Sequence, residues 1–238
     1  MPEAASRPFS IRLFLPDGDP EGLRIVEKSN WSGVGLVFPR SLFPEAAKRS
    51  ELQSPGIYIL VGENEDSTLP RVYIGQADPL YRRLSQHYAQ KDFWSWGVCF
   101  TSRDQNLNRA HVIYLEDRLI AMAQEAKQAT LENDTGSPSA QLSEPDQADA
   151  ESFLQDMLSI FPLVGLSAFE RPDRSNNSTQ TALFLSLRGA KSEGFETTKG
   201  FVVKSGSRAA GSETSSIHQY ISAIRKDLID KGVLRTEG

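Results

Sequence analysis

The chain has 238 residues, and Asp and Glu outnumber Lys and Arg to give a formal net charge of -5 at pH 7. This length can bury a sizeable core, and the 39% hydrophobic content is typical of a soluble globular protein rather than a strongly basic binder of polyanions. The single cysteine, Cys99, excludes an internal disulfide and a cysteine-based metal cluster. No apolar run reaches membrane-spanning length and no signal-peptide pattern is present, so we expect a cytoplasmic protein with no membrane partner.

Charge is distributed unevenly along the chain. Residues 51–118 carry seven basic and nine acidic side chains, 119–170 carry one and nine, and 185–235 carry nine and five. The acidic segment 119–170 therefore lies between two segments that are richer in basic residues. This arrangement permits nucleic acid on parts of the surface, although a merely solvated surface explains it equally well.

The N-terminal part of the chain predicts strands. Residues 1–50 contain short apolar runs separated by Gly, Pro and Asp turns, which indicates a small β-rich unit, with a brief helix over 44–50. The runs "SPGIYIL" at 54–60 and "PRVYIGQ" at 70–76 predict a hairpin with a long connection, and "WGVCFTS" at 96–102 predicts a third strand.

Two helices are predicted between and after these strands. Asp78 and Pro79 suit an N-cap and a first helical residue, and the helix should run to about Ala89. A long amphipathic helix is predicted over 108–129, capped by Asn106 or Asn108. These elements complete a predicted α+β domain over 51–135.

The remainder of the chain predicts a linker and a second unit. Residues 136–152 are small, acidic and nearly free of large apolar side chains, which is typical of a linker. Residues 153–238 then predict a helix ended by Pro162, strands in "TALFLSLRG" and "KGFVVKSGSRA", and a last helix from about Ser215 to Lys231. We expect a small α/β C-terminal unit.

Four polar side chains around the hairpin attract attention. Strand alternation puts Tyr58 and Tyr73 on the face opposite their Ile and Val neighbours, so a suitable register brings both phenols together. Each tyrosine alone is explained by packing. The next helix carries Arg83 and His87 at i, i+4 spacing, so these two side chains project together.

Glu116 interrupts the apolar stripe of the long helix. Its neighbours at i-4, i+3, i+4 and i+7 are all apolar, whereas Asp117 points elsewhere. A buried carboxylate needs a metal ion, an arginine or a shifted pKa. A metal ligand and a structural Glu–Arg pair are both compatible with the spacing.

Together these residues resemble the signature of the GIY-YIG nuclease superfamily. "GIY" stands at 56–58 and "YIG" at 73–75, and Arg83, His87 and a helical Glu116 follow in the order of that family. The resemblance implies a three-stranded antiparallel sheet flanked by helices. It also implies a metal-dependent endonuclease that hydrolyses phosphodiester bonds, with DNA expected rather than RNA.

The resemblance implies a role for each residue. Glu116 would hold a single Mg²⁺ or Mn²⁺, and Arg83 would clamp the scissile phosphate. Tyr58 or Tyr73 would orient or deprotonate the attacking water, with His87 as a proton-transfer partner. Because a phenol titrates near pH 10, a tyrosine base requires Arg83 and the metal to lower its pKa. The asparagine that often follows the glutamate in the family is assigned to Asn133.

The C-terminal sequence carries a second resemblance. "GFVVKSGSRA" and "IRKDLIDKGVL" are similar to the start of a small domain of unknown function that accompanies some bacterial GIY-YIG proteins. His111 and His218 have no metal-ligand partner at suitable spacing and are interpreted as structural. Five basic residues of this region are candidates for backbone contacts with nucleic acid, although a solvated face explains each: Lys199, Lys204, Arg208, Arg225 and Lys226.

Two other functions stay open at this point. One is a non-catalytic nucleic-acid-binding or interaction module on the same fold, and the other is a ribonuclease, because phosphate chemistry is common to both polymers. The sequence does not indicate an oligomeric state.

Overall fold

A computed structural model of the chain divides it into two compact units, Met1–Asp173 and Arg174–Gly238, which are described separately below. The structure describes residues 8–64, 67, 69–104, 106–133, 142–170, 182–187, 190–197, 200–209, 219–230 and 232–235. Within these ranges, no helix has the length and apolar character needed to cross a bilayer.

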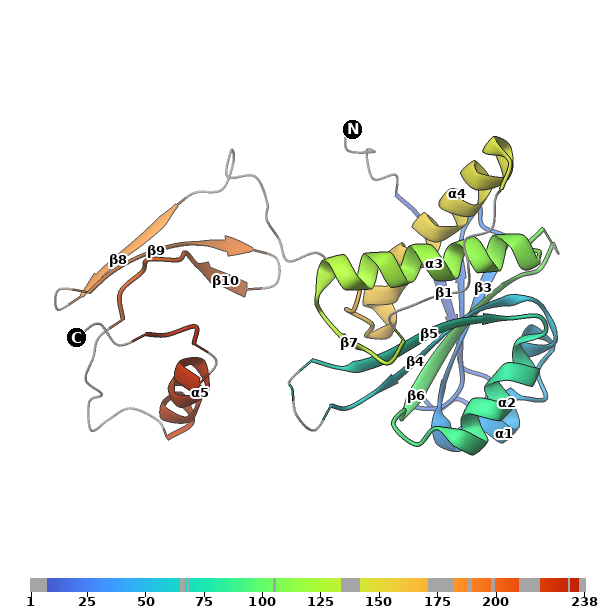
Figure 1. Cartoon of the computed structure of the whole chain (residues 1–238), viewed down its shortest axis with the longest axis horizontal. Helices are drawn as coiled ribbons and strands as arrows, with labels where there is room; N and C mark the ends of the chain where they lie inside the picture. Colours follow the sequence, from blue (N-terminus) through green and yellow to red (C-terminus); the bar gives the residue numbers. More distant parts are fainter. Residues whose placement is uncertain are drawn as a thin grey trace. The chain divides into compact units, whose positions relative to one another are not determined.

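A seven-stranded sheet organises the first unit, in the order β1-β2-β3-β6-β4-β5-β7 (Figure 1). Neighbouring strands are antiparallel except for the short parallel pair of β5 and β7. The strand bounds are β1 Ile11–Phe14, β2 Arg24–Lys28, β3 Gly33–Pro39, β4 Gly56–Gly62, β5 Arg71–Ala77, β6 Trp96–Ser102 and β7 Thr130–Leu131.

The expectation of a separate β-rich unit over 1–50 beside a three-stranded sheet is wrong. Strand β3 pairs with β6 along its whole length, so β1 to β3 extend the sheet that contains the two tyrosine strands. The physical reason lies in β3, which is buried from Gly33 to Phe38. A strand that is buried on both faces needs a partner at each edge and helices over its faces.

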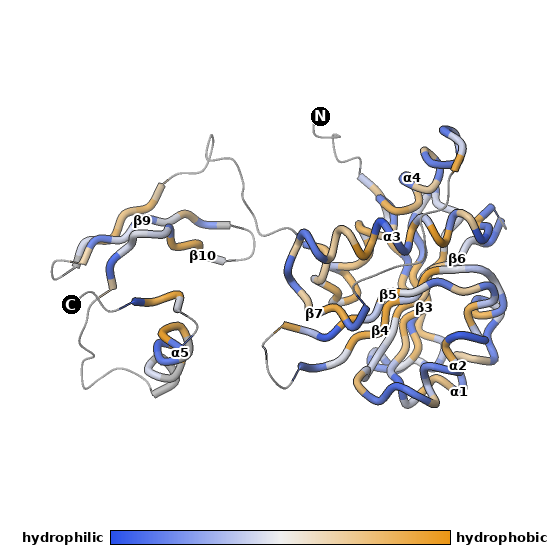
Figure 2. The backbone as a smooth tube through the Cα atoms, in the orientation of Figure 1, coloured by the Kyte–Doolittle hydropathy of each residue, from blue (hydrophilic) through white to orange (hydrophobic). Residues whose placement is uncertain are grey.

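Helices cover both faces of this sheet, and each face has its own core. Apolar residues of α3 and α4 pack on the face that carries Ile57, Ile59 and Ile74. Apolar residues of α1 and α2 pack on the face that carries Tyr58. Figure 2 shows the hydrophobic residues concentrated in the central strands. The helix bounds are α1 Phe43–Ala46, α2 Leu80–Gln90, α3 Arg109–Ala126 and α4 Glu144–Ile160.

The starts of α2 and α3 are positioned by local sequence. Helix α2 begins at Leu80, one residue later than expected, because Pro79 has an extended backbone (ψ 160°) and is the N-cap without a side-chain cap. Helix α3 is capped by Asn108, whose Oδ1 accepts hydrogen bonds from the backbone N–H groups of Ala110 (2.9 Å) and His111 (3.1 Å). The prediction of Asn108 as one of two possible caps is confirmed.

Helix α4 corrects the predicted linker and the predicted boundary at 153. It begins at Glu144, inside the predicted linker over 136–152, and its N-cap Ser143 accepts a hydrogen bond from the Asp146 N–H (3.3 Å). Glu151 of α4 accepts hydrogen bonds from Tyr114 Oη (2.7 Å) and Arg118 Nε (2.5 Å) of α3. The helix therefore belongs to the first unit, and it ends at Ile160, before Pro162 as predicted. Residues 136–141 lie outside the described residues.

The second unit contains a small antiparallel sheet in the order β10-β9-β8 and the helix α5. This confirms a small C-terminal unit of mixed α and β structure, although β9 was not predicted. The predicted start of the last helix near Ser215, as well as Lys199 and His218, lie outside the described residues. The bounds are β8 Leu183–Leu187, β9 Ala190–Thr197, β10 Gly200–Val203 and α5 Gln219–Asp230.

Candidate active site

The register of β4 and β5 brings the two tyrosines together. Tyr58 lies opposite Gly75, and Leu60 lies opposite Tyr73, so both phenols project from the same face. Their rings stack with 6.1 Å between centroids and an interplanar angle of 11°. The predicted sharing of one face is therefore confirmed.

Gly75 makes room for the ring of Tyr58. A Cβ atom at position 75 would lie 2.3 Å from Tyr58 Oη and 2.4 Å from its Cζ. No side chain fits at that distance, so the phenol can lie across β5 only because residue 75 is glycine. The last residue of the second triplet thus positions the tyrosine of the first.

Helix α2 adds an imidazole and a guanidinium. His87 is buried, and its Nε2 atom lies 2.8 Å from Tyr58 Oη. Its ring centroid is 4.7 Å from that of Tyr73. Arg83 lies one turn earlier, is exposed, and donates to Gln86 Oε1 (3.0 Å), and the nearby phenols, first that of Tyr73 and then that of Tyr58, raise the pKa of its guanidinium. The four side chains form one contiguous group.

The protonation states of this group follow from burial. Burial, followed by the negative charge that Tyr73 would carry, raises the pKa of Tyr58 far above its usual value, with a smaller contribution from Glu116. Arg83 lowers the Tyr58 pKa as expected but does not offset burial. Burial, then Arg83 and Lys91, lowers the pKa of His87 to about 4. At neutral pH a protonated phenol therefore meets a neutral imidazole, and the Tyr58 hydroxyl donates to Nε2 when His87 carries its proton on Nδ1. Arg83 acts in the expected direction, and the expectation that Arg83 and the metal together lower the pKa of a tyrosine stays a prediction.

Glu116 approaches from α3, on the other side of the sheet. It is 7% exposed and lies among the buried residues Val112, Leu119, Ile120 and Ala123, as its sequence position predicted. Its charge contributes to the raised pKa of Tyr58, so the carboxylate lies within electrostatic range of the phenols. The structure thus brings Tyr58, Tyr73, Arg83 and His87 together on one face, whereas Glu116 reaches them only through its electrostatic effect on Tyr58.

Glu116 is the only residue predicted to hold the metal, and its buried carboxylate is an oxygen ligand of the kind that a hard divalent cation takes. Among the described residues, no three His, Cys, Asp or Glu side chains are arranged to hold a metal ion together. A closed zinc or calcium cage is therefore not formed by these residues. Mg²⁺ commonly binds through one or two carboxylates, several waters and substrate phosphate. A single buried carboxylate is compatible with this coordination.

Asn133 takes a different position. Its Oδ1 accepts a hydrogen bond from the Ile74 N–H (3.1 Å), and its Nδ2 donates to the Ile74 carbonyl (2.7 Å). The carboxamide thereby continues the pairing of β7 along β5, next to Tyr73 and Gly75. The Asn133 side chain therefore supports β5, the strand that carries Tyr73, by hydrogen bonds to the backbone of Ile74.

Lys91 is a further residue of this neighbourhood that sequence reasoning missed. Its Nζ lies 4.9 Å from the ring centroid of Tyr73, and its charge contributes to the lowered pKa of His87. A signal was present in the sequence, because Lys91 follows Arg83 and His87 at the same spacing of four residues, although it lies just past the end of α2.

The other predicted residues have structural surroundings. Cys99 is buried and unpaired, and burial raises the pKa of its thiol, which makes the thiol unreactive. His111 lies in the first turn of α3. In the second unit, Lys204 pairs with Glu193, so one of the basic residues proposed for backbone contacts is engaged within the chain.

Comparison with known proteins gives one match. Residues 183–238 match the model of a family described as a domain of unknown function (DUF4357). This range overlaps the C-terminal sequence that resembles a small domain of unknown function. Neither the comparison with curated proteins nor that with solved structures returned a match.

Proposed function

We propose that the first unit is a GIY-YIG-type endonuclease that hydrolyses phosphodiester bonds, with DNA as substrate and Mg²⁺ or Mn²⁺ as cofactor. The observation that carries the proposal is the convergence of Tyr58, Tyr73, Arg83 and His87, with Glu116 in electrostatic range of them. These residues come from four separate elements. Such a group of a buried acid, a proton relay and an exposed guanidinium suits the hydrolysis of a phosphate ester.

The proposed division of labour follows from exposure and protonation. Arg83 binds the scissile phosphate, because its guanidinium is exposed and adjoins both phenols. Tyr58 accepts a proton from the attacking water while its own proton passes to His87 Nε2, which is 2.8 Å away and neutral above about pH 4. A divalent cation held by Glu116 would supply Lewis-acid stabilisation of the phosphate charge. Tyr73 stacks on Tyr58 and holds Arg83.

A plasmid-nicking assay tests the proposal. The full chain is incubated with supercoiled DNA and Mg²⁺ or Mn²⁺, and Glu116→Gln is compared with Asp117→Asn. Asp117 is the adjacent carboxylate on α3 and is the matched control. We expect Glu116→Gln to slow nicking by about 100-fold or more, because it removes the anionic oxygen that holds the cation, whereas Asp117→Asn nicks like the wild type.

Equal nicking by wild type and Glu116→Gln would show that the activity does not arise at this site. Cleavage of an RNA substrate but not of DNA would support a phosphodiester hydrolase at this site and would show that its substrate is RNA. Binding of nucleic acid without cleavage of either polymer would favour the non-catalytic module.

A further inference from the structure

Lys91 is a cation at the candidate active site to which the proposed reaction gives no role. It is the C-cap residue of α2, and its Nζ lies 4.9 Å from the ring centroid of Tyr73. The Tyr73 hydroxyl adjoins the guanidinium of Arg83. Tyr73 therefore has one cation at its ring face and another at its hydroxyl.

The backbone of Lys91 is held on both sides. Its N–H donates to the His87 carbonyl (2.9 Å), and its own carbonyl accepts a hydrogen bond from Arg40 Nη1. Arg40 also donates to the Tyr88 carbonyl (3.0 Å), and its guanidinium lies 5.0 Å from the centroid of the Tyr88 ring. Arg40 thus satisfies carbonyl groups at the end of α2 that the helix itself leaves without donors. The Lys91 side chain starts from an anchored position.

The ammonium group of Lys91 is not neutralised within the described part of the chain. No ion pair joins it to a carboxylate there. The next residue, Asp92, pairs with Arg40 Nη2 at 2.9 Å, so its negative charge is balanced by that guanidinium. The Tyr73 ring covers one side of the ammonium and leaves N–H donors for an anion from outside the chain.

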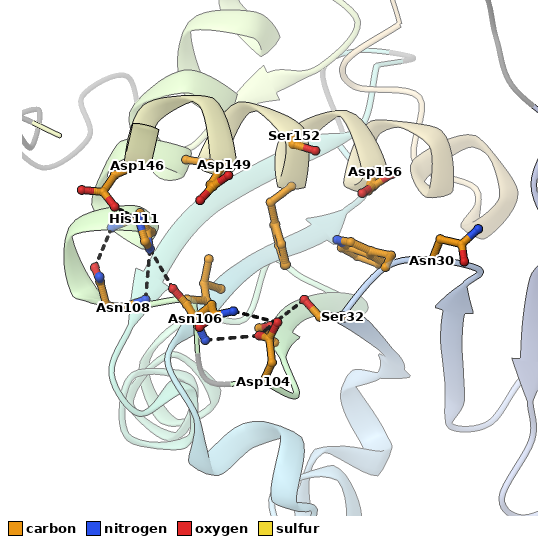
Figure 3. Close-up of a pocket in the computed structure, with 15 residues that line it drawn as sticks. Asn30, Ser32, Asp104, Asn106, Asn108, His111, Asp146, Asp149, Ser152 and Asp156 are labelled. Carbon is orange, nitrogen blue, oxygen red and sulfur yellow. Dashed lines mark hydrogen bonds and ion pairs between the residues drawn. The ribbon is translucent and has the colours of Figure 1, made fainter. Parts of the chain in front are cut away.

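Helices on the two faces of the sheet differ in charge. Helix α2 contains Arg82 and Arg83 and no Asp or Glu, whereas α4 contains five acidic residues and no Lys or Arg. Figure 3 shows three of these acids, Asp146, Asp149 and Asp156, along a groove beside α4. Phosphate groups are attracted to α2 and repelled by α4. A nucleic-acid backbone is therefore expected to reach the candidate active site along α2.

We propose that Lys91 binds a second phosphate of the substrate, on the same strand as the phosphate bound by Arg83. This inference rests on the proposed function, because it requires a nucleic-acid strand that passes Tyr73. One strand presents a phosphate at every nucleotide, so a second cation beside Tyr73 meets a phosphate that neighbours the scissile one. Phosphate contacts fix the position of a strand and carry no base preference. Lys91 is thus a binding residue that sets which phosphate of the strand lies at Arg83.

Fluorescence anisotropy of the full chain with a short labelled DNA duplex, without divalent metal and over a range of KCl concentrations, tests this inference. We expect Lys91→Gln to weaken binding by about tenfold and to lower the slope of log Kd against log salt by about 0.9, because one phosphate contact is lost. Lys91→Arg keeps the charge and should restore both values. Lys127→Gln is the matched control, because Lys127 is an exposed lysine at the C-cap of α3, and it should bind like the wild type.

Single-turnover cleavage by the same variants separates binding from chemistry. Lys91→Gln should raise the half-saturating DNA concentration by about tenfold, whereas its rate at saturating DNA should stay within about twofold of the wild type. A slower rate at saturation with unchanged affinity would show that Lys91 acts on the chemical step through His87, and it would overturn the phosphate contact.

The outcomes distinguish this inference from the proposed function. If the wild type binds and cuts DNA while Lys91→Gln and Lys127→Gln show the same affinity and salt dependence, the second phosphate contact is refuted and the hydrolase stands. If the wild type binds no nucleic acid, the hydrolase and the phosphate contact both fail.

Discussion

Tyr58 and His87 hold each other in complementary protonation states. Burial keeps the phenol protonated and the imidazole neutral, and in the Nδ1–H tautomer of His87 the 2.8 Å hydrogen bond runs from the Tyr58 hydroxyl to Nε2. In the proposed reaction, the attacking water gives a proton to Tyr58, and Tyr58 passes its own proton to the unprotonated Nε2 of His87. The hydrogen bond explains why a tyrosine without a lowered pKa suits the proposed reaction.

The lowered pKa of His87 makes stability depend on pH. Its folded-state value of about 4 lies below the ordinary 6.5, so between these values the unfolded chain binds a proton that the folded chain does not. Acidification through this window should lower the free energy of unfolding by up to about 3 kcal/mol. Urea unfolding at pH 7 and pH 4.5 measures the loss, with His87→Gln as reference. The wild type should lose more stability than the variant, and equal losses would contradict a buried neutral imidazole.

Side-chain positions around the site were largely predictable. The period of two puts Tyr58 and Tyr73 each on the face opposite its Ile and Val neighbours, and the observed register then makes that face common to both. The helical period puts Arg83 beside His87 and Glu116 among apolar neighbours. The net pKa of Tyr58 was not predictable, because it depends on burial that only the folded arrangement determines. The role of Gly75 likewise depends on the cross-strand contact with Tyr58.

At the level of elements, β7 shows what local pattern cannot predict. A strand of two residues has no periodicity, and its place beside β5 is completed by the Asn133 carboxamide. The N-terminal half of helix α4 was missed for a different reason, whereas its second half was predicted. Its first two turns are mostly acidic and polar, although Ser143, Pro145 and Asp146 were a readable helix start, and its buried apolar residues begin only at Ala150.

Asn133→Ala tests the support that β7 gives to β5. The substitution leaves the Ile74 N–H and carbonyl without partners, so we expect the free energy of unfolding to fall by about 1–3 kcal/mol. Asn64→Ala is the matched control, because Asn64 Nδ2 makes an exposed hydrogen bond to Thr130 Oγ1 on the same short strand. It should change stability by no more than about 0.5 kcal/mol. Similar losses in the two variants by urea unfolding would show that Asn133 has no special structural role.

For the whole molecule, the long-range pairing of β3 with β6 decides the architecture. This pairing joins residues about sixty positions apart, so hydrophobic patterns within each segment could predict both strands without predicting that they meet. Both hydrophobic cores consist of residues between Ile11 and Phe169. The predicted site residues and the two cores that position them therefore lie in one unit.

Truncation of the chain to residues 1–173 tests whether the first unit is sufficient for the proposed activity. The shortened protein retains both cores and all five converging side chains, so we expect its single-turnover cleavage rate at saturating DNA to equal that of the full chain. Circular dichroism checks that the fragment is folded. A folded fragment that binds DNA but does not cleave it would place an essential group in the second unit.

The central claim is that side chains from opposite faces of one sheet act as a single hydrolytic site. Single-turnover cleavage by wild type, Tyr58→Phe, Glu116→Gln and the double variant tests this most directly. We predict that each single substitution slows cleavage by about 100-fold or more and that the double variant is hardly slower than the slower single variant, because groups that act as a unit are not additive. Wild-type rates in either single variant would contradict a shared site at Tyr58 and Glu116.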